Sequence, residues 1–185
     1  VTDSNGNPAL QIVRTVEVVG ISNCGLLDMD NNLYSLSNSI VAIGDCFIVG
    51  AENITIDFNG YNITGNSSDN GIYNDGHAGL TIKNGEIYDF ATGINVTGGD
   101  EIKIENMLLE SNPYGVIILL SENINLTKNN ITQSAEIGVK VSGDGSHFLS
   151  ENNISNNSLD FSFSPGDFYV PQIELDNIKL EISTS

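Results

Sequence analysis

The sequence predicts an all-β solenoid in which short parallel strands stack in successive turns of the chain. A glycine followed by an apolar residue recurs at Gly71, Gly93, Gly115 and Gly138, at intervals of 22, 22 and 23 residues. A second phrase, in which apolar and other residues alternate as in residues 102–104, recurs in step with the first. Alternation with a period of two indicates strands with one buried face, and helical spacing is absent. A repeat of this length with this alternation is typical of a solenoid built from strands.

Each repeat contains three short strands. A third set of apolar residues follows the second phrase by five residues in most turns, at Ile63, Ile87, Leu109, Ile131 and Ile154. At roughly 3.3 Å per residue, one repeat traces a closed loop of about 70 Å, which suits a three-sided coil. We therefore expect a three-sheet parallel β-helix of about five coils over residues 40–164.

Asparagine recurs at one bend of the predicted coil. The positions are Asn59, Asn84, Asn106, Asn129 and Asn152. Asparagine tolerates a left-handed backbone and bonds nearby main chain, so it suits a sharp corner. Stacked amides can also form a hydrogen-bonded ladder. We predict one asparagine ladder made of these five residues.

The Asn-rich corners, the short Ile-x-Ile strands and the 22-residue period resemble right-handed parallel β-helix repeats. Such repeats occur in pectate-lyase-like proteins, in NosD-type repeats and in the carbohydrate-binding and sugar-hydrolase (CASH) group. The resemblance covers roughly residues 40–164 and implies a right-handed coil. It specifies a fold rather than an activity, because this fold carries both enzymes and structural proteins.

The segments that flank the repeats also have the pattern of strands. We expect residues 1–39 to form an N-terminal strand or capping segment, with a candidate first coil, and residues 165–185 to form a C-terminal strand tail. Residues 10–19 are rich in β-branched residues, and residues 173–182 alternate in polarity. These terminal strands could pair within the chain or with a neighbouring molecule, and the sequence leaves both alternatives open.

Two cysteines lie one repeat apart, at Cys24 and Cys46. If the segment before residue 39 is already a coil, the two residues stack at about 4.8 Å, which is within reach of a disulfide. We predict this disulfide, which agrees with an oxidising location. The alternative is a pair of buried thiols.

The charge of the chain restricts its partners. The net charge is −18, with only 6 Lys and Arg residues. This balance argues against nucleic acid or an anionic membrane surface as a partner. No apolar run is long enough for insertion into a membrane.

Eight Asn-x-Ser/Thr sequons predict N-glycosylation. They begin at Asn53, Asn62, Asn66, Asn95, Asn125, Asn130, Asn153 and Asn156. Their density favours an extracellular or cell-surface protein. The alternative is that a sequence such as Asn-Ile-Thr simply suits a corner followed by a strand.

Two short segments have the alternating oxygen side chains that calcium loops use. They contain Asp28, Asp30 and Asn32 in one case and Asp3, Asn5 and Asn7 in the other. Neither completes an EF-hand pattern. Calcium is the one cofactor that the sequence suggests.

No cluster of residues has the pattern of a catalytic site. In the families that this chain resembles, lyases use Lys or Arg beside carboxylates that hold calcium, and hydrolases use clustered Asp residues. Hydrolysis needs two carboxylates on one face, about 5 to 9.5 Å apart, and the outward positions predict no such pair. His77 near Asp75 is the nearest approach to an acid/base pair, and we interpret it as a solvated loop residue.

These observations predict a non-enzymatic structural protein, a subunit of a surface layer, sheath or filament that self-assembles into an oligomer or polymer. Subunits would join through terminal strands or by end-to-end stacking of coils. One alternative is a carbohydrate-binding module, polysaccharide lyase or glycoside hydrolase, with exposed Tyr73, Tyr88, Tyr114 and Phe148 to contact glycans. Another is a trimeric receptor-binding fibre of a phage or adhesin.

Overall fold

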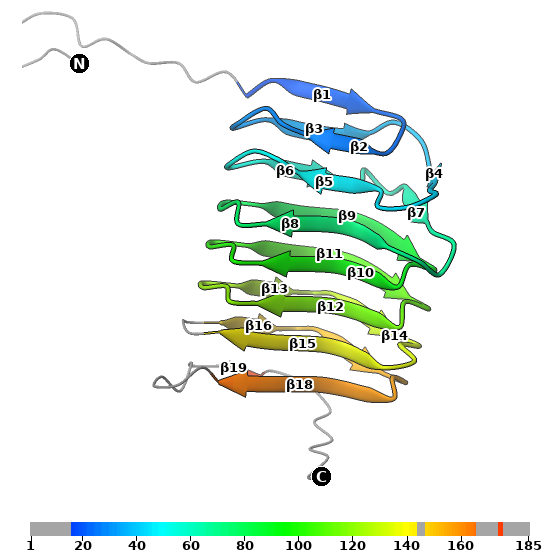
Figure 1. Cartoon of the computed structure of the whole chain (residues 1–185), viewed down its shortest axis with the longest axis vertical. Helices are drawn as coiled ribbons and strands as arrows, with labels where there is room; N and C mark the ends of the chain where they lie inside the picture. The colour runs from blue at the N-terminus through cyan, green and yellow to red at the C-terminus, as the bar shows by residue number, and fades with distance from the viewer. Residues whose placement is uncertain (1–15, 144–146, 166–173, 176–185) are drawn as a thin grey trace, which may run out of the picture.

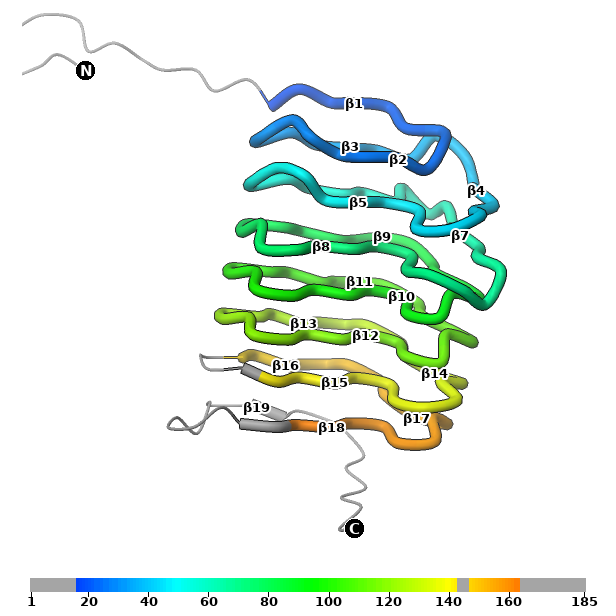
Figure 2. Tube along the Cα trace, viewed as in Figure 1, coloured from blue at the N-terminus to red at the C-terminus, as the bar shows by residue number. Residues whose placement is uncertain are grey.

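The computed structural model describes residues 16–143, 147–165 and 174–175. Within these ranges the chain winds in stacked turns, from β1 at one end of the solenoid to β18 and β19 at the other (Figure 1). Neighbouring turns pair through parallel strands. The trace in Figure 2 shows the turns stacked one on another. The predicted all-β parallel solenoid is confirmed. No helix in the described ranges has the length and apolar character needed to span a bilayer.

Among the described residues, one side of the solenoid is a sheet of seven strands. In spatial order these are β2 (Gly25–Leu27), β5 (Phe47–Val49), β8 (Asn70–Asp75), β10 (Thr92–Thr97), β12 (Tyr114–Leu119), β15 (Ile137–Gly143) and β18 (Leu159–Pro165). Six complete turns separate these seven strands. The solenoid therefore has one turn more than the repeat pattern indicated, because β2 already belongs to it.

In the part of the chain that the structure describes, the other side is a bent sheet of twelve strands with two faces. The first face contains β1 (Val18–Ile21), β3 (Leu33–Leu36), β6 (Thr55–Asp57), β9 (Thr81–Tyr88), β11 (Lys103–Glu110), β13 (Asn125–Thr127), β16 (Phe148–Ser150) and β19 (Glu174–Leu175). The second face contains β4 (Ile40–Val41), β7 (Asn62–Thr64), β14 (Asn130–Thr132) and β17 (Asn153–Ser155), together with the second halves of β9 and β11. Because β9 and β11 run unbroken through the bend, two of the three predicted sheets are continuous.

The register places residues one period apart on adjoining strands. Ile94 of β10 pairs with Ile72 of β8 on one side and with Val116 of β12 on the other. All three side chains are fully buried. Equivalent inward columns run along both faces of the twelve-stranded sheet, so the core is a set of aliphatic stacks inside the coil. Stacked β-branched side chains pack well on pleated strands, which explains the Ile-rich phrases.

The recurrent glycines occupy a crowded inward position near the start of successive strands in the seven-stranded sheet. They are Gly71 in β8, Gly93 in β10, Gly115 in β12 and Gly138 in β15. A Cβ atom on Gly93 would lie 2.7 Å from the carbonyl oxygen of Gly115, and one on Gly115 would lie 2.5 Å from that of Gly138. A side chain at either site would therefore clash with the next turn. Close approach of stacked backbones is the physical reason for the repeated glycine.

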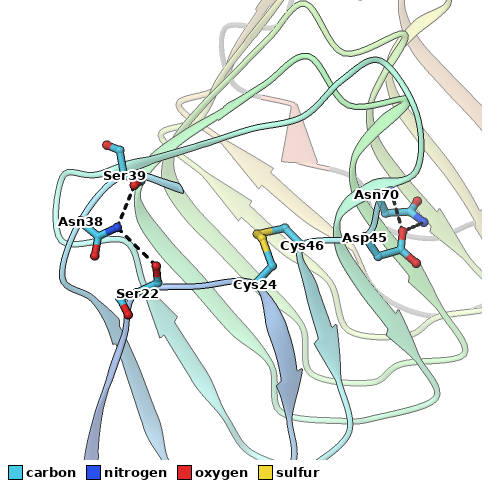
Figure 3. Close-up of a disulfide and its surroundings, with 7 residues drawn as sticks. All are labelled: Ser22, Cys24, Asn38, Ser39, Asp45, Cys46 and Asn70. Atoms are coloured by element: carbon cyan, nitrogen blue, oxygen red, sulfur yellow. Dashed lines mark hydrogen bonds between the residues drawn. A yellow bond between two sulfur atoms is a disulfide. The ribbon is translucent and has the colours of Figure 1, made fainter. Parts of the chain in front are cut away.

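The disulfide closes the first turns of the solenoid (Figure 3). Cys24 and Cys46 are bonded, with their Cα atoms 4.4 Å apart, just before the paired strands β2 and β5. The predicted bridge is confirmed. Polar contacts surround it: Asn38 donates to the carbonyl oxygen of Ser39 at 2.8 Å, and Asp45 Oδ1 accepts from the next turn.

The described strands nearest the chain termini pair within the molecule. β1 pairs with β3, and β19 pairs with β16. The sides of β1 and β2 that face away from β3 and β5 have no strand partner among the described residues. The edge of the solenoid at β1 and β2 is therefore open within this part of the chain.

Candidate functional site

The bend between the two faces of the twelve-stranded sheet is formed by residues with a left-handed backbone. Asn84 has φ of 60° in β9, and Asn106 has φ of 54° in β11. A single left-handed residue turns an extended strand sharply, and asparagine adopts this conformation more readily than other side chains do. Asn59 has φ of 52° in the preceding turn. In that turn four residues, 58–61, separate the two faces, whereas two residues, 84–85, do so in β9.

A short ladder of polar side chains follows this bend on the outside of the solenoid. Asn106 Nδ2 donates to Asn84 Oδ1 at 3.1 Å, and Asn84 Nδ2 donates to Asp57 Oδ1 at 3.2 Å. The same Asp57 oxygen accepts the backbone N–H of Asn59 at 2.9 Å. These bonds hold the amide groups in one orientation along the solenoid axis.

The prediction of one five-membered asparagine ladder is wrong in its register. Lys128, not Asn129, continues the outer column below Asn106, because Glu105 pairs with Thr127. Asn129 and Asn152 lie one position further along, and each is only 2 % exposed. A shift of one residue in a strand moves a side chain to the opposite face. Asn84 and Asn106 therefore belong to an outer ladder, and Asn129 and Asn152 belong to an inner ladder. Asn59 joins the outer ladder only through its backbone N–H.

The inner ladder satisfies buried main-chain groups. Asn129 Nδ2 donates to the carbonyl oxygen of Ile104, and its Oδ1 accepts the N–H of Met107 at 3.1 Å. Asn152 Nδ2 donates to the carbonyl oxygen of Leu126 at 2.7 Å. Asparagine supplies both donors and an acceptor, so one side chain can pair both main-chain groups freed at a bend.

A second inner column was not predicted. Asn112 and Asn157 make equivalent bonds where the second face turns toward the seven-stranded sheet. They are spaced 45 residues apart, and Ser134 occupies the intervening turn. Because the residue type changes between turns, a search for recurring asparagine misses this column.

A polar groove lies on the outside of the bend between the two faces. It has a volume of about 610 Å³ and spans the turns from β6 to β14. Its polar lining consists of Asp57, Asn59, Asn84, Glu86, Asn106, Lys128 and Asn130. The groove thus contains the outer ladder, and we take it as the candidate site.

Most of the charges in and around the groove are paired. Lys83 Nζ lies 3.5 Å from Asp57 Oδ2. Lys128 Nζ lies 4.0 Å from Glu151. Tyr88 donates its hydroxyl hydrogen to Glu86 at 2.8 Å. Burial raises the pKa of Tyr88 to about 12, and the hydrogen bond and negative charge of Glu86 add to this rise.

The eight sequon asparagines all lie on the outside of the solenoid, and none faces the core. Five are exposed, whereas Asn62, Asn95 and Asn125 are half-buried. Asn62, Asn130 and Asn153 each begin a strand of the second face and precede an inward isoleucine. For these three, the sequon coincides with a pattern that the strand itself favours.

The other predicted positions do not come together with the groove. Asp30 Oδ1 accepts the backbone N–H of Glu52 at 2.8 Å, while Asp3, Asn5 and Asn7 lie outside the described residues. No group of three or more His, Cys, Asp or Glu side chains suited to a metal ion occurs in the part of the chain that the structure describes. His77 Nδ1 lies 3.6 Å from Glu52 Oε1.

Comparison with known families agrees with this geometry. The sequence profile of the family described as the right-handed β-helix region matches residues 46–168. The chain belongs to this family. The right-handed β-helix accounts for the stacked parallel turns and the inward columns described above. Neither the curated proteins nor the solved structures contain a significant match to this right-handed β-helix.

Proposed function

We propose that this right-handed β-helix is an extracellular structural subunit that assembles end to end through its N-terminal turns. One observation carries the proposal. Among the described residues, seven of the ten exposed large hydrophobic side chains lie between residues 16 and 48. A concentration of exposed apolar groups at one end of a soluble molecule indicates an interaction surface.

Among the described residues, open strand edges lie at this end of the solenoid, on β1 and β2, and also at the other end, on β18 and β19. Val18 on β1 and Leu26 on β2 are 62 % and 58 % exposed, and the outer sides of both strands are unpaired within the described ranges. An unpaired edge is a template for another strand. Parallel pairing continues unchanged when the first turn of one copy meets the last turn of another, and such a head-to-tail contact repeats into a filament.

An oxidising, extracellular location is supported by two features. The Cys24–Cys46 disulfide stabilises the turns nearest the proposed contact. The sequon asparagines face outward, so attached glycans could be accommodated without entering the core.

Sedimentation velocity of the full chain over a range of concentrations and ionic conditions tests the assembly. We expect association that increases with concentration. Replacing Val41 and Ile43, which are 82 % and 92 % exposed, by Glu should abolish it. The matched control is Leu120→Glu, because Leu120 is 75 % exposed but lies in the middle of the solenoid. A monomer under all conditions overturns the proposal, and a fixed trimer favours a fibre of the receptor-binding type.

A further inference from the structure

Three Asn-Gly steps lie within the described residues, at Asn59, Asn70 and Asn84, and the fourth, at Asn5, lies outside them. Asn-Gly is the dipeptide most prone to deamidation, because glycine has no side chain to shield its backbone nitrogen from the asparagine amide. The three steps share the same local chemistry. Any difference in their reactivity therefore comes from the fold.

Asn59 and Gly60 form the exposed tip of a tight turn between the two faces of the twelve-stranded sheet. Asn59 has φ of 52° and Gly60 has φ of 81°, and the N–H of Tyr61 donates to the carbonyl oxygen of Phe58 at 2.8 Å. Positive φ at both central positions is characteristic of a type I′ turn. A Cβ atom on Gly60 would meet nothing within 4 Å. The backbone of this turn therefore has room to change conformation.

The side chain of Asn59 makes no hydrogen bond among the described residues, because its bond to Asp57 Oδ1 is made by the backbone N–H. The nitrogen that follows it is restrained by one main-chain bond, from the Gly60 N–H to the carbonyl oxygen of Asn84 at 2.8 Å. Opening an exposed hydrogen bond at a turn costs less free energy than opening a paired strand. Both reacting groups at this step are thus accessible to each other through a small local motion.

Asn70 is held in β8 by hydrogen bonds to both of its side-chain polar atoms. Its Nδ2 donates to Asp45 Oδ1 at 2.8 Å, and its Oδ1 accepts from Asn95 Nδ2 at 3.1 Å. The next residue, Gly71, is buried, and a Cβ atom there would lie 2.6 Å from the carbonyl oxygen of Gly93. Neither the amide nor the following nitrogen has room to move while the strand stays paired.

Asn84 is held in β9 in the same way. Its Nδ2 donates to Asp57 Oδ1 at 3.2 Å, and its Oδ1 accepts from Asn106 Nδ2 at 3.1 Å. A Cβ atom on the next residue, Gly85, would overlap the side chain of Phe58. Reaction at either of the two strand steps therefore requires local opening of the solenoid.

We propose that Asn59 is a site of spontaneous deamidation, and that it reacts well ahead of Asn70 and Asn84. The backbone nitrogen of Gly60 attacks Cγ of Asn59 and forms a five-membered imide ring. The bond from Cγ to Nδ2 breaks, and ammonia leaves with the proton of the Gly60 nitrogen. Water then opens the ring at either carbonyl carbon. The product is aspartate or its isomer isoaspartate, in which the main chain runs through the former side-chain carbonyl.

Either product adds a carboxylate to the candidate site. The groove already holds the carboxylates of Asp57 and Glu86 together with the cation of Lys128. It therefore becomes more acidic as the protein ages. Isoaspartate also lengthens the main chain by a carbon atom at the turn that separates the two faces. This modification goes beyond the structural role proposed above and does not depend on assembly.

Peptide mapping by mass spectrometry tests the proposal on the full chain held in a mildly alkaline buffer. The converted fraction at each Asn-Gly step is measured over time. In the folded chain we expect Asn59 to convert roughly tenfold or more faster than Asn70 and Asn84, because residues in paired strands react only from a locally opened state. In urea, where the fold is lost, the three steps should convert at similar rates.

Two results of this comparison overturn the proposal. One is a rate at Asn70 or Asn84 in the folded chain that equals or exceeds the rate at Asn59. The other is conversion of Asn59 in urea but not in the folded chain, which would mean that the turn protects its amide as well as the strands protect theirs.

The variant Gly60→Ala tests the cyclic route, because the added methyl group shields the attacking nitrogen. Most of the conversion at Asn59 should be lost. The matched control is Gly44→Ala, since Gly44 also has a positive φ, of 90°, and open space at its Cβ position, but it does not follow an asparagine. Alanine is strained at both positions. The control should convert Asn59 at the unmodified rate, and equal rates in the two variants contradict the proposal.

Discussion

Asn152 accepts two hydrogen bonds from Asn129 through a single oxygen. The backbone N–H and the side-chain Nδ2 of Asn129 each lie 3.0 Å from Asn152 Oδ1. Both side chains are buried, and both also bond main-chain groups of the turn above. The inner ladder thus adds side-chain hydrogen bonds between turns that also meet through strand pairing and through the aliphatic columns of the core.

Replacing Asn129 by Ala should destabilise the fold, because it leaves the N–H of Met107 and the carbonyl oxygen of Ile104 without their partners. We expect a loss of about 2–4 kcal/mol in the free energy of unfolding, since each unsatisfied buried group costs about 1–3 kcal/mol. Urea denaturation measures this loss. The control is Asn130→Ala at the adjacent exposed position, which should change stability by less than about 0.5 kcal/mol. Equal effects would show that the inner ladder contributes nothing.

Replacing a glycine by alanine should destabilise the fold only where the added Cβ atom would meet the next turn. Gly115→Ala places a Cβ atom 2.5 Å from the carbonyl oxygen of Gly138 and 2.6 Å from Ile131. Overpacking of this kind costs about 1–3 kcal/mol. At Gly20 in β1, a Cβ atom would meet nothing within 4 Å, so Gly20→Ala should be neutral. Thermal unfolding of the two variants compares them, and a neutral Gly115→Ala contradicts the backbone contact.

Loss of the disulfide should weaken the N-terminal turns. The bond closes a sequence separation of 22 residues, for which loop entropy predicts about 3 kcal/mol. Reduction of the native protein, or the double change Cys24→Ala and Cys46→Ala, should lower stability by a similar amount. Hydrogen exchange should increase first in β2 and β5. The double variant serves as its own control, because a reducing agent should leave its stability unchanged.

His147 should make stability depend on pH. It is 1 % exposed and lies in the inward column next to Ile124, and neither ring nitrogen has a hydrogen-bond partner among the described residues. Burial lowers the pKa of His147 below its ordinary value, and the nearby charge of Glu122 opposes this shift. The unfolded chain therefore binds the proton more readily than the folded chain does. Stability should fall as the pH drops below about 6.5, the ordinary pKa of histidine, toward the lowered folded value.

Comparison with His147→Leu separates this effect from that of the many carboxylates. The variant resembles the aliphatic residues of the same column, so its free energy of unfolding should fall less between about pH 7 and pH 5 than that of the wild type. Chemical denaturation at several pH values gives both slopes. Parallel slopes would mean that His147 does not take up a proton on unfolding in this range.

Positions that repeat without interruption were predicted well from the sequence. The Ile-x-Ile phrases and the Gly-led phrases lie in the strands expected of them, with the expected side chains inward. The disulfide followed from the same logic, because residues one period apart stack in a parallel coil. The groove was not predicted, since its lining residues come from a bend and share no single motif.

The repeat period and the two-residue alternation therefore determined the parallel solenoid and the Cys24–Cys46 bond by themselves. Only the tertiary structure decided which asparagines face outward at Asn84 and Asn106 and which face inward at Asn129 and Asn152. The physical reason is that the interval between these asparagines changes from 22 to 23 residues. One residue of register reverses the direction of a side chain in a strand, and the turns between strands set that register.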